Sequence, residues 1–222
     1  MIDYELNSII PGVYHVRCGT RFDLGMLFLR SQEFYESQNE DFKGKSFTIL
    51  DFMRWYSKDF SRSSSFTYPS DWSGYNVPGL VSIKATGIAF EIGDANIYDR
   101  TMRSINSKAL NECGTNFYLV GTTGNFGDVS DPDSILAHEM AHALYYLDAE
   151  YKSSADKLVD KYRHTEALFE SIRENGYHDD VADDEFQAYM VSGASFLVDE
   201  VDADALSEFR NLYTKTLKKH LC

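Results

Sequence analysis

The chain has few cysteines. It contains three, Cys18, Cys113 and Cys222, at wide spacing. An odd, scattered set of this kind excludes a disulfide framework and a metal site of the CxxC type. We therefore expect reduced thiols and a cytoplasmic protein. The first residues, Met1 to Glu5, lack the basic and apolar segments of a signal peptide, and secretion by a route without such a signal stays open.

Basic residues and long apolar runs are also scarce. The sequence has 21 Lys and Arg against 35 Asp and Glu, with a formal net charge of -14. Nucleic acids and anionic membranes require a basic binding surface, so we expect neither as a partner. No apolar run approaches the roughly 20 residues that span a bilayer. The acidity serves solubility or steers a basic substrate, and the sequence gives no oligomeric state.

Hydrophobic and aromatic residues are abundant. They make up 43% and 14% of the chain, which excludes a disordered protein and provides for a sizeable core. We expect a catalytic domain over residues 81–222 and an N-terminal region over residues 1–80 that shapes the substrate site. The aromatic segment from Tyr68 to Tyr75 packs in a core or lines a cleft.

Hydrophobic periodicity predicts an α+β chain. Short strands are expected at Val13–Val16, at Leu80–Ile83, at Gly87–Ile92 and at Asn116–Val120. Helices are expected over residues 48–60, over residues 94–112 with Ile97, Ile105 and Ala109 inward, and over residues 203–221. Ser61 to Ser65 reads as a hinge, and Gly121 to Gly127 reads as a flexible connection. The chain after residue 127 is expected to be almost wholly helical.

The strongest chemical signal is His138-Glu139-Met140-Ala141-His142. Asp131 is expected to cap this helix, with Pro132 in its first turn. Two histidines four residues apart leave one helix face together and can bind one metal ion. Glu139 is displaced round the helix, where it can accept a proton from a water molecule on the metal. Two buried histidines and a glutamate without a metal would lose their hydration without compensation.

A catalytic zinc ion needs a third protein ligand and an open fourth position. The residues after His142 exclude a nearby third histidine. Glu185 is our first choice, because it lies on a predicted helix with an apolar face; an exposed acid at a helix start is the alternative reading. Glu166 is the second choice, followed by His178 and His164. Asp183 or Asp184 could orient a ligating histidine.

The motif and the distant helical glutamate resemble the gluzincin zinc metallopeptidases, and the long gap to Glu185 is most similar to the branch of lethal factor and the Pro-Pro endopeptidases. The resemblance implies a zincin-like fold with a small central sheet packed on the motif helix. It implies a tyrosine that stabilises the oxyanion, for which Tyr177 is the nearest match, beside His178. It also implies an upstream edge strand for the substrate peptide, here Asn116–Val120.

These features predict a zinc-dependent metallopeptidase. Its ligands would be His138, His142 and Glu185, its proton carrier Glu139, and its oxyanion donor Tyr177, His178 or Tyr189. One alternative is a zinc-dependent amidase or hydrolase of a small molecule or modified peptide, which a closed aromatic pocket would favour. Another is a non-catalytic zinc-binding regulatory protein. The pattern also admits other divalent metals.

Overall fold

The computed structural model describes residues 2–61, 63–124, 129–131, 133–163, 166–174, 179–193 and 202–221. The chain forms two compact units, Met1–Asn125 and Phe126–Cys222. The division falls in the connection expected between Gly121 and Gly127, whereas the hinge expected at Ser61–Ser65 and the boundary expected near residue 80 both lie inside the first unit. Among the described residues, no helix combines the length and apolar character that a bilayer crossing requires.

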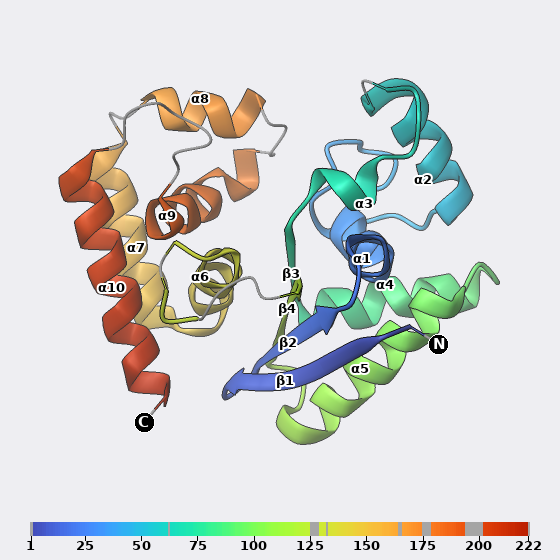
Figure 1. The fold of residues 1–222 in the computed structure, drawn as a ribbon, viewed down its shortest axis with the longest axis horizontal. Helices are drawn as coiled ribbons and strands as arrows, with labels where there is room; N and C mark the ends of the chain where they lie inside the picture. The colour runs from blue at the N-terminus through green and yellow to red at the C-terminus, as the bar shows by residue number, and fades with distance from the viewer. Residues whose placement is uncertain are drawn as a thin grey trace. The chain divides into compact units, whose positions relative to one another are not determined.

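The first unit holds a four-stranded mixed sheet in the order β1-β2-β4-β3 (Figure 1). Strands β1 (Tyr4–Ile10) and β2 (Val13–Cys18) form an antiparallel hairpin. Strand β4 (Tyr118–Thr123) runs parallel to β2, and β3 (Gly74–Pro78) pairs antiparallel with its other side. The expected strand at Val13–Val16 is present within β2. The strand expected at Asn116–Val120 begins at Tyr118 and continues to Thr123, so residues 121–123 are part of the sheet and not of the expected flexible connection. The expectation that Asn116–Val120 is an edge strand is wrong, because β3 covers that edge.

Helix α1 (Arg21–Glu36) packs on this sheet and contacts α4 (Gly79–Glu91) and α5 (Ile97–Cys113). The approach to β4 is close, because a Cβ atom added at Gly121 would lie 2.5 Å from the Phe28 ring of α1. The unit is completed by α2 (Ile49–Trp55), the π-helix η1 (Tyr56–Phe60) and the short α3 (Tyr68–Asp71).

Two expectations for this unit need correction. The segment expected to hold two strands, residues 80–92, instead forms one helix, α4, which ends at Glu91 with Ile92 as its cap. Its buried residues Ser82, Ala85, Thr86 and Ala89 follow helical spacing, and these small side chains allow α1 and α5 to pack closely. Helix α5 forms as expected with its inner residues buried, but Ile97 is 54% exposed because it occupies the first helical position after the Asn96 cap.

The aromatic segment contributes to the core of the first unit. Tyr68 and Tyr75 are 1% and 2% exposed. The Tyr75 ring stacks on Phe28 at 5.6 Å, and the Tyr68 ring meets Phe52 edge-on at 5.3 Å. Of the two readings of this segment, the structure therefore supports core packing.

One partly buried histidine makes the first unit sensitive to acid. His15 on β2 lies 2.7 Å from the Thr122 hydroxyl, and burial, with the nearby Arg17, lowers its pKa from 6.5 to about 4. Below pH 6.5 the unfolded chain binds a proton that the folded chain does not, so stability falls as the pH drops from 6.5 to 4. Because the side chain is partly exposed, we expect this to cost about 1–2 kcal/mol.

The measurement is urea unfolding across this pH range for wild type and His15→Gln, which cannot titrate. Tryptophan fluorescence reports on the first unit, since both tryptophans, Trp55 and Trp72, lie within it. The free energy of unfolding of wild type should decline more steeply than that of the variant. If the free energy of unfolding fell equally with pH in wild type and variant, His15 would not be the source of the acid sensitivity.

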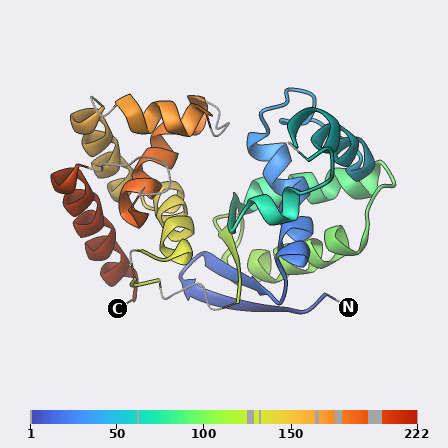
Figure 2. The same ribbon diagram turned by 45° about the horizontal axis from the view of Figure 1, so that its top comes forward.

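All elements described in the second unit are helical. They are α6 (Ile135–Leu147), α7 (Ala149–Tyr162), α8 (Glu166–Glu174), the short 3-10 helix η2 (Asp179–Val181), α9 (Ala182–Ser192) and α10 (Ala203–Leu221). Helices α7 and α10 lie side by side in both views (Figures 1 and 2). Helix α9 contacts α6, α7, α8 and α10, so it is the central helix of this unit.

The molecule is therefore α+β with a helical second half, as the sequence predicts. The expectation of a small sheet in one domain with the motif helix is wrong, because all four strands belong to the first unit, three of them before residue 80, whereas α6 belongs to the second. The helix expected over residues 203–221 is present as α10. The motif helix begins at Ile135, three residues after Pro132. Its cap is Ser134, whose hydroxyl accepts from the Ala137 amide, whereas the Asp131 side chain accepts from the Asp133 amide in the preceding turn.

Candidate metal centre

Helix α6 presents the two motif histidines to α9. His138 and His142 lie one helical turn apart, and the side chain of His142 is 2% exposed while that of His138 is 14% exposed. Ala137 and Ala141 beside them are fully buried, and such small residues allow a second helix to approach closely. The helix pair α6–α9 therefore frames the site.

Helix α9 contributes Glu185 from its first turn. Glu185 is 3% exposed, which contradicts the alternative of an exposed acid at a helix start. The next residues, Phe186 to Val191, are all buried in the second unit. Because residues on every side of α9 are buried, the helix is fixed within the second unit, and Glu185 is held toward α6 at little conformational cost.

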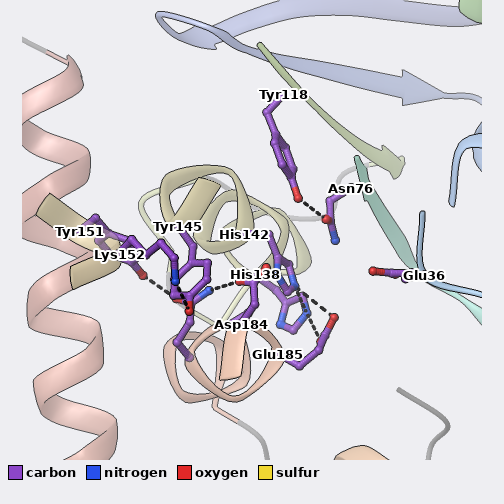
Figure 3. A network of polar contacts seen from close by, with 12 residues as sticks. Glu36, Asn76, Tyr118, His138, His142, Tyr145, Tyr151, Lys152, Asp184 and Glu185 are labelled. Atoms are coloured by element: carbon purple, nitrogen blue, oxygen red, sulfur yellow. Dashed lines mark hydrogen bonds and ion pairs between the residues drawn. The ribbon is translucent and has the colours of Figure 1, made fainter. Parts of the chain in front are cut away.

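The ligand atoms of these three residues all lie within 4.8 Å of one another. The two histidine Nε2 atoms are 3.3 Å apart. The Glu185 Oε1 lies 3.7 Å from the Nε2 of His142, and its Oε2 lies 3.9 Å from that of His138 (Figure 3). Two donors on one helix and one on a neighbouring helix thus converge on one point.

A hydrogen bond at Nδ1 fixes the orientation of each histidine. The Nδ1 atom of His142 lies 3.0 Å from Asp184 Oδ1, so it donates its proton to the carboxylate. The Nδ1 atom of His138 lies 3.1 Å from the Ser192 hydroxyl, which itself donates to the Ala188 carbonyl. Since that hydroxyl has one hydrogen, it accepts from His138. Both rings are protonated at Nδ1 and turn Nε2 toward each other.

The electrostatics of the two histidines differ. Burial and the neighbouring His142 hold the pKa of His138 well below its ordinary value. Burial also disfavours charge on His142, but the carboxylates of Asp184, Glu185 and Glu139 outweigh it and raise its pKa to about 10. Without a metal, the histidine pair therefore holds one positive charge, on His142, which the three neighbouring carboxylates stabilise.

The residues fit a zinc ion. Two nitrogen ligands of a tetrahedral zinc, each at about 2.0–2.1 Å, lie about 3.3 Å apart, and two imidazoles with one carboxylate form a known catalytic ligand set. The two Nε2 atoms have that separation, and the buried carboxylate of Glu185 supplies the third donor. Hydrogen bonds from ligating histidines to a carboxylate or other acceptor are the usual support of such a centre.

Comparison of the chain with family models, curated proteins and solved structures found no match.

The motif glutamate is placed differently from the ligands. Glu139 follows His138 on α6 and is 5% exposed. Its charge contributes to the raised pKa of His142, so it lies within electrostatic reach of the cluster. A buried carboxylate near the cluster that does not belong to its donor set is a candidate proton acceptor.

The remaining candidates lie outside what the structure describes. Tyr177, His178 and His164 are not among the described residues, and of Glu166 only the backbone, at the start of α8, is described. Tyr189 is described: it is 5% exposed, and its ring centroid lies 4.6 Å from that of His138.

Sequence reasoning missed one residue that contacts the cluster, Ser192. It lies seven positions after Glu185 on the same helix. Because residues separated by seven positions share a helix face, the spacing could have found it once α9 was accepted as the second side of the site. Of the two aspartates considered for orienting a histidine, Asp184 makes the contact, whereas Asp183 pairs with Arg163.

Proposed function

We propose that this protein is a zinc-dependent metallopeptidase of gluzincin type, with a zincin-like catalytic site in its second unit. The observation that carries the proposal is the convergence of His138, His142 and Glu185, with both histidines fixed at Nδ1 so that their Nε2 atoms meet. A buried cluster of this composition is costly without a cation. Its donor set is that of a catalytic zinc centre with one position left for water.

Each residue has a separate role in this proposal. His138, His142 and Glu185 hold the ion, while Asp184 and Ser192 keep the two imidazoles in orientation. Zinc, when bound, supplies a Lewis acid that activates water and polarises the scissile carbonyl at neutral pH. Glu139 accepts the proton that the attacking water loses, and it then donates that proton to the nitrogen of the leaving amine as the C–N bond breaks.

A further donor is needed for the oxyanion that develops at the carbonyl. The resemblance to gluzincins proposes Tyr177, with His178 beside it. Tyr189 is the third candidate, and the contact of its ring with His138 supports a place beside the centre. Replacing each by Phe, or His178 by Ala, would identify the donor as the residue whose loss lowers kcat with little change in KM.

We propose a peptide, and not a small molecule, as the substrate. The small-molecule alternative would gain from an aromatic pocket formed by residues 68–75, but Tyr68 and Tyr75 are buried in the core of the first unit. These side chains are thus occupied by packing. The choice between the two substrate classes is open to direct test.

The test is incubation of the zinc-loaded chain with a peptide library, with mass spectrometry of the products. We expect cleavage that a chelator abolishes and added zinc restores. Cleavage that persists in the chelator would contradict the metal-dependent mechanism. A zinc-loaded chain that leaves every peptide intact but hydrolyses small amides would replace the peptidase by the amidase, and no hydrolysis of either would leave the non-catalytic zinc protein.

A further inference from the structure

A buried series of hydrogen bonds connects helix α7 to the candidate metal centre. The Tyr151 hydroxyl donates to Gln187 Oε1 at 2.7 Å, and Gln187 Nε2 donates to Asp184 Oδ1 at 2.9 Å. The same carboxylate oxygen lies 3.0 Å from His142 Nδ1 (Figure 3). Tyr151 and Gln187 are 1% and 0% exposed. The series therefore runs from one helix, through α9, to a histidine of α6.

The direction of this series is fixed by its two ends. A phenol hydroxyl has one proton, and Tyr151 gives it to the amide oxygen of Gln187. The amide must then turn its NH2 group to the Asp184 carboxylate, which can only accept. A reversed amide would place oxygen against carboxylate oxygen. Tyr151 thus holds Gln187 in the one orientation that supports Asp184.

The support matters because Asp184 is not itself enclosed. Its side chain is 22% exposed and lies in the first turn of α9, where water competes for its oxygens. A hydrogen bond from a fully buried amide ties the carboxylate to the protein interior. Asp184 then offers His142 a fixed acceptor, and an imidazole with a fixed acceptor at Nδ1 keeps its Nε2 in one direction.

We propose that Tyr151 and Gln187 are positioning residues of the metal centre. They hold Asp184, which fixes the ring orientation and the Nδ1–H form of His142. Neither residue belongs to the three converging donors. The inference rests on the proposed function for the identity of the ion, but the hydrogen bonds exist in the metal-free chain, so part of it can be tested without metal.

The first experiment measures zinc affinity by chelator competition for Tyr151→Phe, Gln187→Met and the double variant of the full chain. Loss of an outer hydrogen-bond partner weakens metal binding by about 10–100-fold, so we expect about tenfold weaker binding in each single variant. Because Tyr151 acts only through Gln187, the double variant should bind zinc as Gln187→Met does, without a further loss.

Tyr56→Phe is the matched control. Tyr56 in the first unit is also buried, at 2% exposed, and its hydroxyl donates to Asp71 Oδ2, outside the series. Its loss should lower the free energy of unfolding without changing zinc affinity. Tyr151→Phe removes a single oxygen atom, so it carries the test alone where Gln187→Met fails to fold.

The second experiment follows the Nδ1–H proton of His142 by NMR in the metal-free chain. We expect it to exchange with water at least about tenfold faster in Tyr151→Phe than in wild type, because the acceptor has lost its anchor.

The outcomes separate the two claims. If wild type binds zinc and both single variants bind it equally well, the positioning role is wrong and the proposed function stands. If the losses of the two single variants add, the residues act independently and the series is wrong. If wild type binds no zinc, the proposed function is wrong, and the exchange rate of the His142 proton then decides the positioning role: faster exchange in Tyr151→Phe supports it, and an unchanged rate overturns it.

Discussion

Glu139→Gln is expected to lower kcat/KM for peptide hydrolysis by at least about a hundredfold, the lower end of the contribution of a positioned general base. Glutamine has the shape of glutamate but cannot accept the proton of the attacking water. Since Glu139 is not one of the three converging donors, zinc content should stay at the wild-type level. The measurement is the rate on a peptide taken from the library screen, together with the metal content of each preparation.

The control for this variant is Glu170→Gln, which makes the same chemical change at an exposed position of α8. It should leave both rate and metal content unchanged. A Glu139→Gln protein that keeps its zinc and hydrolyses peptides at the wild-type rate would remove Glu139 from the mechanism. Loss of zinc in this variant would instead make Glu139 a ligand.

Glu185→Gln is expected to weaken zinc binding by more than about a hundredfold, which exceeds the usual effect of an outer hydrogen-bond partner. The neutral amide has nearly the volume of the carboxylate but lacks its charge, so the loss reports the missing donor and not a cavity. Chelator competition measures the affinity, and circular dichroism confirms that the helical content is retained.

Glu166→Gln is the matched variant for the competing third ligand. It should bind zinc as wild type does. The reverse result, with binding weakened by Glu166→Gln and unchanged in Glu185→Gln, would move the third ligand to α8 and leave Glu185, although within 4.8 Å of the two histidines, without a metal role. Equal weakening in both would require a donor set of four protein residues.

Local spacing made part of the site predictable from the sequence. His138 and His142 are four residues apart, and the helix that carries them is marked by its apolar neighbours. Glu185 could be ranked first because the residues after it have a helical apolar pattern. The contacts of Ser192 with His138 and of Tyr151 with Gln187 depend on how α9 packs against α6 and α7, and no local pattern encodes that packing. The pair Asp184 and Gln187, by contrast, is three residues apart on one helix, a spacing at which helical side chains meet.

The fold was predictable where one periodicity dominates, as in α5 and α10. The prediction was wrong at α4. There Val81, Ile83 and Ile88 suggest strands, but the small buried residues of the segment form a helical face. Strand β3 was missed because Gly74, Asn76 and Pro78 are turn formers. Strand β3 forms because it pairs with β4, and this pairing joins segments some forty residues apart in the sequence.

The central claim is that His138, His142 and Glu185 bind one zinc ion. The most direct measurement is elemental mass spectrometry of the full chain purified without chelator, beside the double variant His138→Ala, His142→Ala. We predict about one zinc per chain in wild type and none above background in the double variant, a ratio set by one ligand cluster with a single open position. A wild-type chain that holds no zinc, even after zinc is added back, would contradict the account.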